Sequence, residues 1–302
     1  MKLGIPYMGS KRKIAKDVLD KCLELAPETK YFYDLFGGGG AISFEALQRD
    51  QIQEVFYNDF NPQIATLMQG LKDNATPKGL YEKWISREEY KDRRYENSIE
   101  GAIIATCWSF GNNPKKGYLY SKALTPHKKL LHEVVVNKSK ESLLKFNKEF
   151  NINISESVLN IELANNRRLR IGREIRQLAK SRLGELRHLE SLNKLQHLTS
   201  LNRLKEISIF PTITNLSYED VKINTPSNET LIYLDPPYAN TTKYTDIICH
   251  DELLKWIQKS KYKIIVSSYE FDGLKEVYSK DVKTPMSSTN NSKRQEKLFV
   301  NF

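Results

Sequence analysis

The chain has 302 residues, a mass of 35.0 kDa, a formal net charge of +10 and a pI near 9.2. This length suits one large domain or a core with an inserted subdomain, and the positive charge favours a polyanionic partner. Cys22, Cys107 and Cys249 lie far apart and form no Cys-x-x-Cys pair, which argues against a disulfide framework or a zinc site. The sequence shows no signal peptide and no apolar run of membrane-spanning length, so we expect a reduced, cytoplasmic protein that binds no metal.

The first predicted element is an amphipathic helix that begins after Ser10. Apolar residues four positions apart, among them Ile14, Val18 and Cys22, would line one face of this helix, and the Ser10 hydroxyl can cap its first turn. These are core positions, so we expect Cys22 to pack rather than to react.

A strand, a glycine turn and a helix follow between residues 31 and 47. The turn is the run Gly37-Gly38-Gly39-Gly40. Glycine at such a turn permits a positive φ and lets a ligand approach the backbone closely. The single compact glycine run argues against pyrophosphate binding, and no Lys-Ser/Thr pair follows it, so a P-loop is not indicated.

A second strand, Glu54 to Asn58, is followed by Asp59. This residue lies about 20 positions beyond the glycines, where an acidic residue meets ribose hydroxyls in nucleotide-binding folds. An ordinary turn residue is the alternative, and the place of Asp59 in this unit favours the ligand role. Asn61 and Pro62 are predicted to cap and start the next helix.

Residues 75–225 differ in composition from the rest of the chain and are predicted to form an insertion. Its first half contains amides, lysines and aromatics interleaved with glycines, which suits a loop that meets DNA bases and phosphates. The residues predicted to make these contacts are Asn112, Asn113, Lys115, Lys116 and Tyr118. The alternative is a surface loop whose aromatic side chains anchor it to the core.

The second half of the insertion is strongly basic. A helix here could follow the DNA backbone and give salt-dependent affinity, with Arg167 and Arg170 as the predicted contacts. A solvated basic face is the alternative.

Leucines then recur at every third residue from Leu183 to Leu204. Because a helix has about 3.6 residues per turn, this stripe would circle the helix instead of facing one partner. We interpret the stretch as a structural part of the insertion. A monomer is expected, and dimerisation through this region is the alternative.

The apolar strand Leu231 to Leu234 ends in the tetrapeptide Asp235-Pro236-Pro237-Tyr238. An ionised carboxylate accepts hydrogen bonds and cannot donate them, and the two prolines present their carbonyls with no N–H beside them. Tyr238 adds a flat face on which a nucleobase could stack. Such a corner can hold an exocyclic amine, as amino-group methylation of a base requires. A plain proline turn after a strand is the alternative.

A helix from Asp251 to Lys259, a strand from Lys263 to Ser267 and a last strand from Lys297 to Phe302 complete the pattern. Alternating strands and helices predict an α/β fold, a Rossmann-like and mostly parallel sheet with helices on both faces. Ligands bind at the carboxyl ends of such strands, near a switch in strand order. The glycine run, Asp59 and Asp235 all follow strand ends, so we expect one site to hold them.

Taken in order, these motifs resemble the Dam-type (alpha-group) DNA adenine-N6 methyltransferase family. Phe36-Gly37-Gly38-Gly39 matches its glycine loop, and Asp235 to Tyr238 matches its Asp-Pro-Pro-Tyr motif after a long insertion. Pro6 to Lys11 resembles its opening motif, an aromatic residue four positions before a lysine. The resemblance implies a methyltransferase core at residues 1–74 and 226–302 and a mainly helical DNA-recognition insertion at 75–225.

The same resemblance implies roles for particular residues. Asp235, Pro236, Pro237 and Tyr238 would carry catalysis. The cofactor S-adenosyl-L-methionine would contact Tyr7, Lys11, Asp34, Phe36, Gly37, Gly38, Gly39, Asp59, Tyr218 and Asp235. Tyr218 is included because residues 216–220 resemble the segment that packs on the cofactor adenine. Residues 294–298 resemble the family's closing element and are given no chemistry.

The implied reaction is transfer of a methyl group to N6 of an adenine flipped out of double-stranded DNA, with Asp235 and the Pro236 carbonyl accepting the two N6–H bonds. N4 of cytosine and adenine in RNA present the same amine and are alternative targets. An inactive DNA-binding homologue and a nucleotide hydrolase are further alternatives. The expected setting is a bacterial or phage-infected cell, with or without a partner restriction endonuclease.

Overall fold

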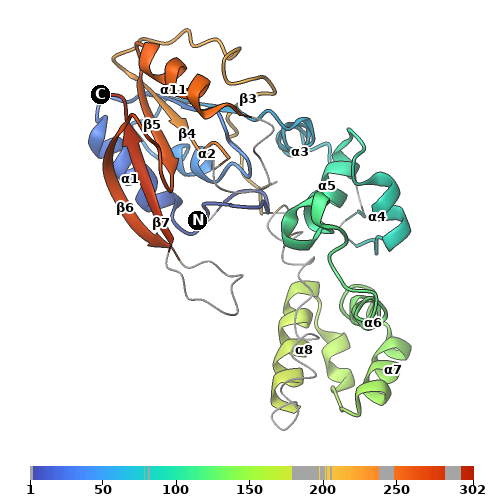
Figure 1. The fold of residues 1–302 in the computed structure, drawn as a ribbon. Coiled ribbons are helices and arrows are strands. Elements are labelled where there is room, and N and C mark those ends of the chain that lie inside the picture. Colours follow the sequence, from blue (N-terminus) through green and yellow to red (C-terminus); the bar gives the residue numbers. More distant parts are fainter. Residues whose placement is uncertain are drawn as a thin grey trace. The chain divides into compact units, whose positions relative to one another are not determined.

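The computed structural model describes residues 3–77, 79–80, 82–178, 197, 201, 203–204, 206–237, 248–282 and 294–302 (Figure 1). The described strands are β1 (Tyr31–Asp34), β2 (Glu54–Asn58), β3 (Thr212–Thr214), β4 (Thr230–Leu234), β5 (Lys263–Ser268), β6 (Lys275–Val282) and β7 (Arg294–Val300). The described α-helices are α1 (Ala15–Leu25), α2 (Ala41–Ala46), α3 (Pro62–Lys72), α4 (Arg87–Arg93), α5 (Ile99–Cys107), α6 (Thr125–Val135), α7 (Lys140–Phe150), α8 (Ala164–Leu178) and α11 (His250–Lys259). Short 3₁₀ helices are η1 (Phe110–Asn112), η2 (Pro114–Lys116) and η3 (Glu156–Asn160).

The chain divides into two compact units. The first comprises Met1–Ile5, Gly9–Lys72 and Ile207–Phe302, and the second comprises Pro6–Met8 and Asp73–Glu206. The second unit is helical in its described part, and no described helix of either unit is long and apolar enough to cross a membrane.

The first unit is built on one sheet. In the described part of the chain it has seven strands in the order β3-β2-β1-β4-β5-β7-β6. Neighbours from β3 to β5 are parallel, whereas β7 runs antiparallel to both β5 and β6. The predicted α/β fold with a mostly parallel sheet is therefore confirmed, with β3 and β6 as strands that the sequence pattern did not indicate.

Helices cover both faces of the central strands (Figure 1). On one face α1 and α2 pack through residues such as Val18 and Ile42, and on the other α11 packs through Leu253 and Ile257. All five residues of β4 are buried, as expected of a parallel strand that is covered on both sides. This double cover keeps the carboxyl ends of β1 and β4 at fixed positions.

Helix α1 starts later than the predicted cap at Ser10. Its N-cap position is Ile14, and no side chain caps it. Residues 11–14 instead form a turn in which Ile14 N–H donates to the Lys11 carbonyl at 2.8 Å, and the Lys11 side chain makes buried ion pairs. Cys22 is fully buried, as its place on the apolar face predicted.

The second unit ends at Glu206, earlier than the predicted end of the insertion at residue 225. The following segment belongs with the sheet, because β3 pairs with β2 from Thr212 to Thr214. Most of the leucine stripe from Leu183 to Leu204 lies outside the described residues; its described members Leu201 and Leu204 are buried. DNA recognition by this unit stays a prediction.

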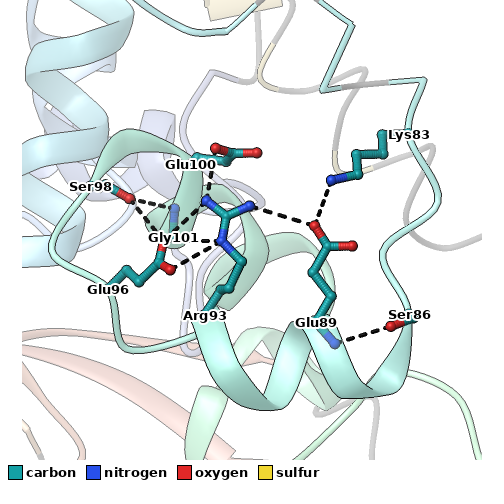
Figure 2. Close-up of polar contacts among 8 residues, drawn as sticks. All are labelled: Lys83, Ser86, Glu89, Arg93, Glu96, Ser98, Glu100 and Gly101. Atoms are coloured by element: carbon teal, nitrogen blue, oxygen red, sulfur yellow. Dashed lines mark hydrogen bonds and ion pairs between the residues drawn. The ribbon is translucent and has the colours of Figure 1, made fainter.

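A polar network joins α4 and α5 within the second unit (Figure 2). The Arg93 guanidinium donates to Glu96 in the turn at 3.1 Å and to Glu100 in α5 at 2.8 Å. Ser86 and Ser98 cap the two helices by accepting from the N–H groups of Glu89 and Gly101, each at 3.0 Å. The turn between α4 and α5 is therefore stabilised by the ion pairs of Arg93 and by the Ser98 cap at the start of α5.

Gly101 lies where this turn touches α5, and a Cβ there would lie 2.5 Å from the Glu96 carbonyl oxygen. Overpacking of this kind costs about 1–3 kcal/mol, whereas alanine in a helix gains at most about 1 kcal/mol over glycine. We therefore expect Gly101→Ala to reduce the hydrogen-exchange protection of α4 and α5, with amides of the first unit unchanged. Equal or higher protection in the variant would show that the turn accommodates the methyl group.

Candidate functional site

Three aspartates follow neighbouring parallel strands at their carboxyl ends. Asp34 ends β1 and lies opposite Tyr57 of β2 and Tyr233 of β4. Asp59 and Asp235 each come two residues after the partner of Asp34 on their own strand, so both follow the carboxyl end of that strand. The strand order reverses between β1 and β4, since the chain adds β2 and β3 on one side and β4 and β5 on the other. Ligands bind at such a switch point in open α/β sheets.

Hydrogen bonds from β2 and the residue after it fix the conformation of the glycine loop between β1 and α2. Gly38 N–H donates to Asp59 Oδ2 at 2.7 Å, and the Tyr57 hydroxyl donates to the Gly38 carbonyl at 2.7 Å. Gly40 precedes α2 with a φ of 71°, in the left-handed region that favours glycine. A Cβ at Gly37 would lie 2.2 Å from the Tyr57 ring. Packing therefore requires glycine at position 37, and the backbone conformation favours it at position 40.

Asp59 acts as a tie within this loop. Its second carboxylate oxygen accepts from Asn61 N–H at 2.8 Å, so both oxygens accept backbone hydrogen bonds. Burial raises its pKa above the usual value, while these two hydrogen bonds oppose the rise. Contact with a ribose stays a prediction for this residue.

Asp34 is buried with one oxygen unpaired. Its Oδ2 accepts from the Ser43 hydroxyl of α2 at 2.6 Å, whereas Oδ1 has no hydrogen-bond partner in the described part of the chain. Burial raises the pKa of Asp34 to about 7; the Ser43 hydrogen bond opposes this rise, and the carboxylates of Asp235 and Asp59 add to it. A buried acceptor without a donor is costly, so this oxygen is suited to a ligand that donates.

Asp235 is held by a buried lysine. Lys11 Nζ lies 2.9 Å from Asp235 Oδ1 and 3.1 Å from Glu296 Oε1 on β7. The Ser267 hydroxyl of β5 donates to the same Glu296 oxygen at 2.7 Å. Burial acts to lower the pKa of Lys11, but Asp235, Tyr233 and Glu296 together raise it above its ordinary value. Lys11 is therefore a charged, paired residue.

The proline turn after β4 is anchored from α11. His250 Nε2 lies 3.0 Å from the Pro237 carbonyl oxygen. Catalytic roles for Pro236 and Pro237 stay predictions, and Tyr238 lies outside the described residues.

Phe36 and Tyr218, predicted from separate motifs, lie together. Their ring centroids are 5.5 Å apart, and Tyr218 also meets the Trp256 ring edge-on at 5.4 Å. Tyr7 belongs to the second unit, so it is not among the residues that the first unit brings together.

Asn58 is a site residue that the sequence pattern treated only as the end of a strand. Its amide donates to the carbonyls of Leu35 at 3.1 Å and Leu216 at 3.0 Å, and its carbonyl accepts from Leu216 N–H at 3.0 Å. It therefore ties the ends of β1 and β2 to the segment that carries Tyr218. Glu296, Ser267 and His250 were also missed: the segment 294–298 was given no chemistry, and no local motif marks Ser267 or His250.

A pocket of about 280 Å³ lies beside Asn58 on one face of β1, β2 and β3. Its walls include the rings of Tyr33 and Phe56, which stack with centroids 4.1 Å apart, and residues Leu216 and Val221. The first unit thus offers an apolar recess next to the strand that leads to Asp59.

Tyr118 and Arg167, two of the residues predicted to contact DNA, use their polar groups inside the second unit. The Tyr118 side chain donates to the Ile85 carbonyl at 2.7 Å and its ring stacks on Trp108, so the alternative of an anchoring aromatic applies to it. Arg167 is 1% exposed, and its guanidinium donates to the carbonyls of Val135, Ile161 and Glu162. The prediction of DNA contact is corrected for both, because their polar atoms are occupied inside the fold.

The amides and the remaining basic residues behave differently. Asn113 is buried and caps Lys115 N–H at 2.9 Å, and Asn112 donates to the Thr106 carbonyl at 2.8 Å. Both amides thus shape the loop. Lys115, Lys116 and Arg170 are exposed, with Arg170 in an ion pair with Glu174 at 2.7 Å. DNA contact stays a prediction for these residues.

The family model for D12 class N6 adenine-specific DNA methyltransferases matches residues 7–292. The chain belongs to this family. The match confirms the resemblance to Dam-type adenine methyltransferases that the glycine loop and the Asp235 motif predicted.

Comparisons with individual proteins add less to this D12-class assignment. No curated protein matches the sequence. Two solved structures of the rRNA methyltransferase aviRa from Streptomyces viridochromogenes each match with 10% identity and a TM-score of 0.35, over 96% of this chain and 84% of that one. This likeness is too distant to indicate a shared substrate or reaction.

The D12-class site as described contains carboxylates, a lysine and backbone donors. Among the described residues, no group of three or more His, Cys, Asp or Glu side chains could hold a metal ion.

The raised pKa of Asp34 has a consequence for stability. Because folding raises this pKa from 3.8 to about 7, the folded protein keeps a proton between those pH values that the unfolded chain has released. The free energy of unfolding should therefore fall as pH rises through this range and level off above it. Asp34→Asn stays neutral and should remove this fall, a gain over wild type of roughly 1–4 kcal/mol at alkaline relative to acidic pH. Urea unfolding at several pH values measures it, and parallel pH profiles for the two proteins would contradict it.

Proposed function

We propose that this protein transfers a methyl group from S-adenosyl-L-methionine to N6 of an adenine in double-stranded DNA. The observation that carries the proposal is the convergence of the glycine loop, Asp34 and Asp235 at one switch point of the sheet, in a chain of the D12 class. Cofactor, nucleic acid and target atom are the parts of the proposal that experiment must test.

The residues at the switch point fit this cofactor. The unpaired Oδ1 of Asp34 is a buried acceptor suited to the cofactor's ammonium group. The glycine loop lets the ligand lie close to the backbone, and the Phe36 and Tyr218 rings offer faces for its adenine. When bound there, S-adenosylmethionine supplies an electrophilic methyl group on a sulfonium.

Asp235 is the proposed acceptor for the target amine. Its carboxylate and the Pro236 carbonyl accept the two N6–H bonds, which draws N6 towards tetrahedral geometry and localises its lone pair for attack on the methyl carbon. As the N6–carbon bond forms, the bond from carbon to the sulfonium sulfur would break, and the N6 cation would then lose a proton. The same negative charge stabilises the positive charge that develops on N6 during transfer. Tyr238 is proposed to stack on the adenine, which must leave the duplex to reach this corner.

The second unit is the proposed DNA-binding part. Lys115 and Lys116 are exposed on the loop that follows α5, and Phe110 beside them is 46% exposed. Exposed lysines suit phosphates and an exposed aromatic ring suits stacking on bases. The net charge of +10 supports a polyanionic partner.

Methyl transfer from labelled S-adenosylmethionine to duplex DNA tests the reaction. We expect labelled N6-methyladenine with the wild type and a loss of about 10²-fold or more in rate with Asp235→Ala, since the charge opposite N6 is removed. Asp272→Ala, at an exposed aspartate of the same unit, should be unaffected.

The products separate the proposal from its alternatives. Label on cytosine N4, or on adenine only in RNA, would replace the substrate and keep the role of Asp235. An Asp235→Ala variant as active as wild type would refute that role. Cofactor binding without transfer to any nucleic acid would indicate an inactive homologue.

The lysine pair gives a further expectation. Replacing Lys115 and Lys116 by alanine should weaken DNA binding and reduce the slope of log K against log salt by about 1 for each phosphate that a lysine no longer neutralises. Lys259→Ala, an exposed lysine on α11, is the control. Fluorescence anisotropy at several salt concentrations measures both; an unchanged slope would place the DNA contacts elsewhere.

A further inference from the structure

The ion pair at Asp235 continues to a residue that the proposed reaction does not use. Glu296 lies on β7, is 4% exposed, and places Oε1 3.1 Å from Lys11 Nζ. Lys11 in turn lies 2.9 Å from Asp235 Oδ1. A buried chain of contacts thus runs from Ser267 through Glu296 and Lys11 to the proposed acceptor.

The charges along this chain do not cancel. One lysine between two carboxylates leaves a net negative charge, whereas Lys11 and Asp235 alone would form a nearly neutral pair. Inside a protein, where charges are poorly screened, this difference matters for a cation that forms next to Asp235. Because Glu296 offsets the positive charge of Lys11, the Asp235 carboxylate can still attract the positive charge that develops on N6 of the target adenine.

The geometry supports a positioning role as well. Lys11 lies in the turn before α1 and carries a flexible side chain, which one ion pair fixes poorly. Glu296 is fixed by the sheet, since it lies opposite Lys280 in the pairing of β7 with β6. Ser267, on β5, holds the same Glu296 oxygen at 2.7 Å. Glu296 therefore keeps the Lys11 ammonium at one side of the Asp235 carboxylate.

We propose that Glu296 is a positioning residue for methyl transfer: it balances and anchors Lys11, so that Asp235 remains an anionic acceptor for the target amine. This inference rests on the proposed function of the same site. The alternative is a purely structural ion pair, whose removal would lower stability and leave the transfer step unchanged.

Single-turnover methylation of duplex DNA with saturating cofactor distinguishes the two. Glu296→Gln keeps the shape and removes the charge, and should slow transfer about 10- to 100-fold while cofactor and DNA affinities change by less than about 3-fold. Ser267→Ala removes a hydrogen bond from the same carboxylate but not its charge, and should slow transfer much less.

A double variant tests the mechanism itself. In Glu296→Gln the Lys11 cation would neutralise Asp235, and we expect this to slow methyl transfer. Adding Lys11→Met should then restore part of the rate, so the effects of the two substitutions are non-additive. Additive losses, or a Glu296→Gln rate equal to wild type, would overturn the inference. Should Glu296→Gln fail to fold, Glu296→Asp keeps the charge but draws it away from Lys11, and it should slow transfer more than Ser267→Ala does; a Glu296→Asp rate equal to wild type would overturn the inference.

The methyl-transfer activity of the wild type distinguishes a failure of this inference from a failure of the proposed function. A wild type that transfers no methyl group to any nucleic acid contradicts the proposed function. A wild type that transfers normally beside an unaffected Glu296→Gln contradicts only the role of Glu296.

Discussion

The clustering of three aspartates at the carboxyl ends of β1, β2 and β4, with Asp34 and Asp59 buried and Asp235 partly exposed, is the constraint on which the rest of this site depends. Buried carboxylates near one another repel and lose hydration, so each needs its own compensation. Asp59 is satisfied by two backbone N–H groups, and Asp235 by the Lys11 ammonium. Asp34 is satisfied by Ser43 at one oxygen only, and its pKa is raised to about 7. The least compensated of the three carboxylates is the one that gains most from a cationic ligand.

These compensations explain why the site draws on distant parts of the chain. Lys11 comes from the segment before α1 and Glu296 from β7, and both reach the end of β4. Asn58 joins the ends of β1 and β2 to the segment after β3. The methyl donor and the target amine would then lie in one electrostatic environment, in which the charges of Asp34, Asp235 and Lys11 affect one another.

Much of this fold follows from local sequence patterns. The glycine run, the strand before Asp235 and the acidic residue after β2 are each marked by neighbouring residues, and the structure has them at strand ends. The strands β3 and β6 were missed because β3 has three residues and β6 is a polar sequence. Burial within the second unit was also beyond prediction: Arg167 and Arg170 look alike in sequence, yet only Arg167 is enclosed. No local pattern indicates that Lys11 pairs with Glu296, because the two residues are far apart in the sequence and meet only where the turn before α1 reaches β7.

Photolabelling can locate the cofactor on the chain. Ultraviolet irradiation of the protein with labelled S-adenosylmethionine, followed by peptide mapping, attaches label where the ligand lies. We expect label in peptides that contain the glycine loop and Asp34, or the residues around Tyr218 and Asp235, and we expect unlabelled cofactor to compete with it. Label confined to the second unit, between residues 82 and 178, would contradict a cofactor site at the switch point of the sheet.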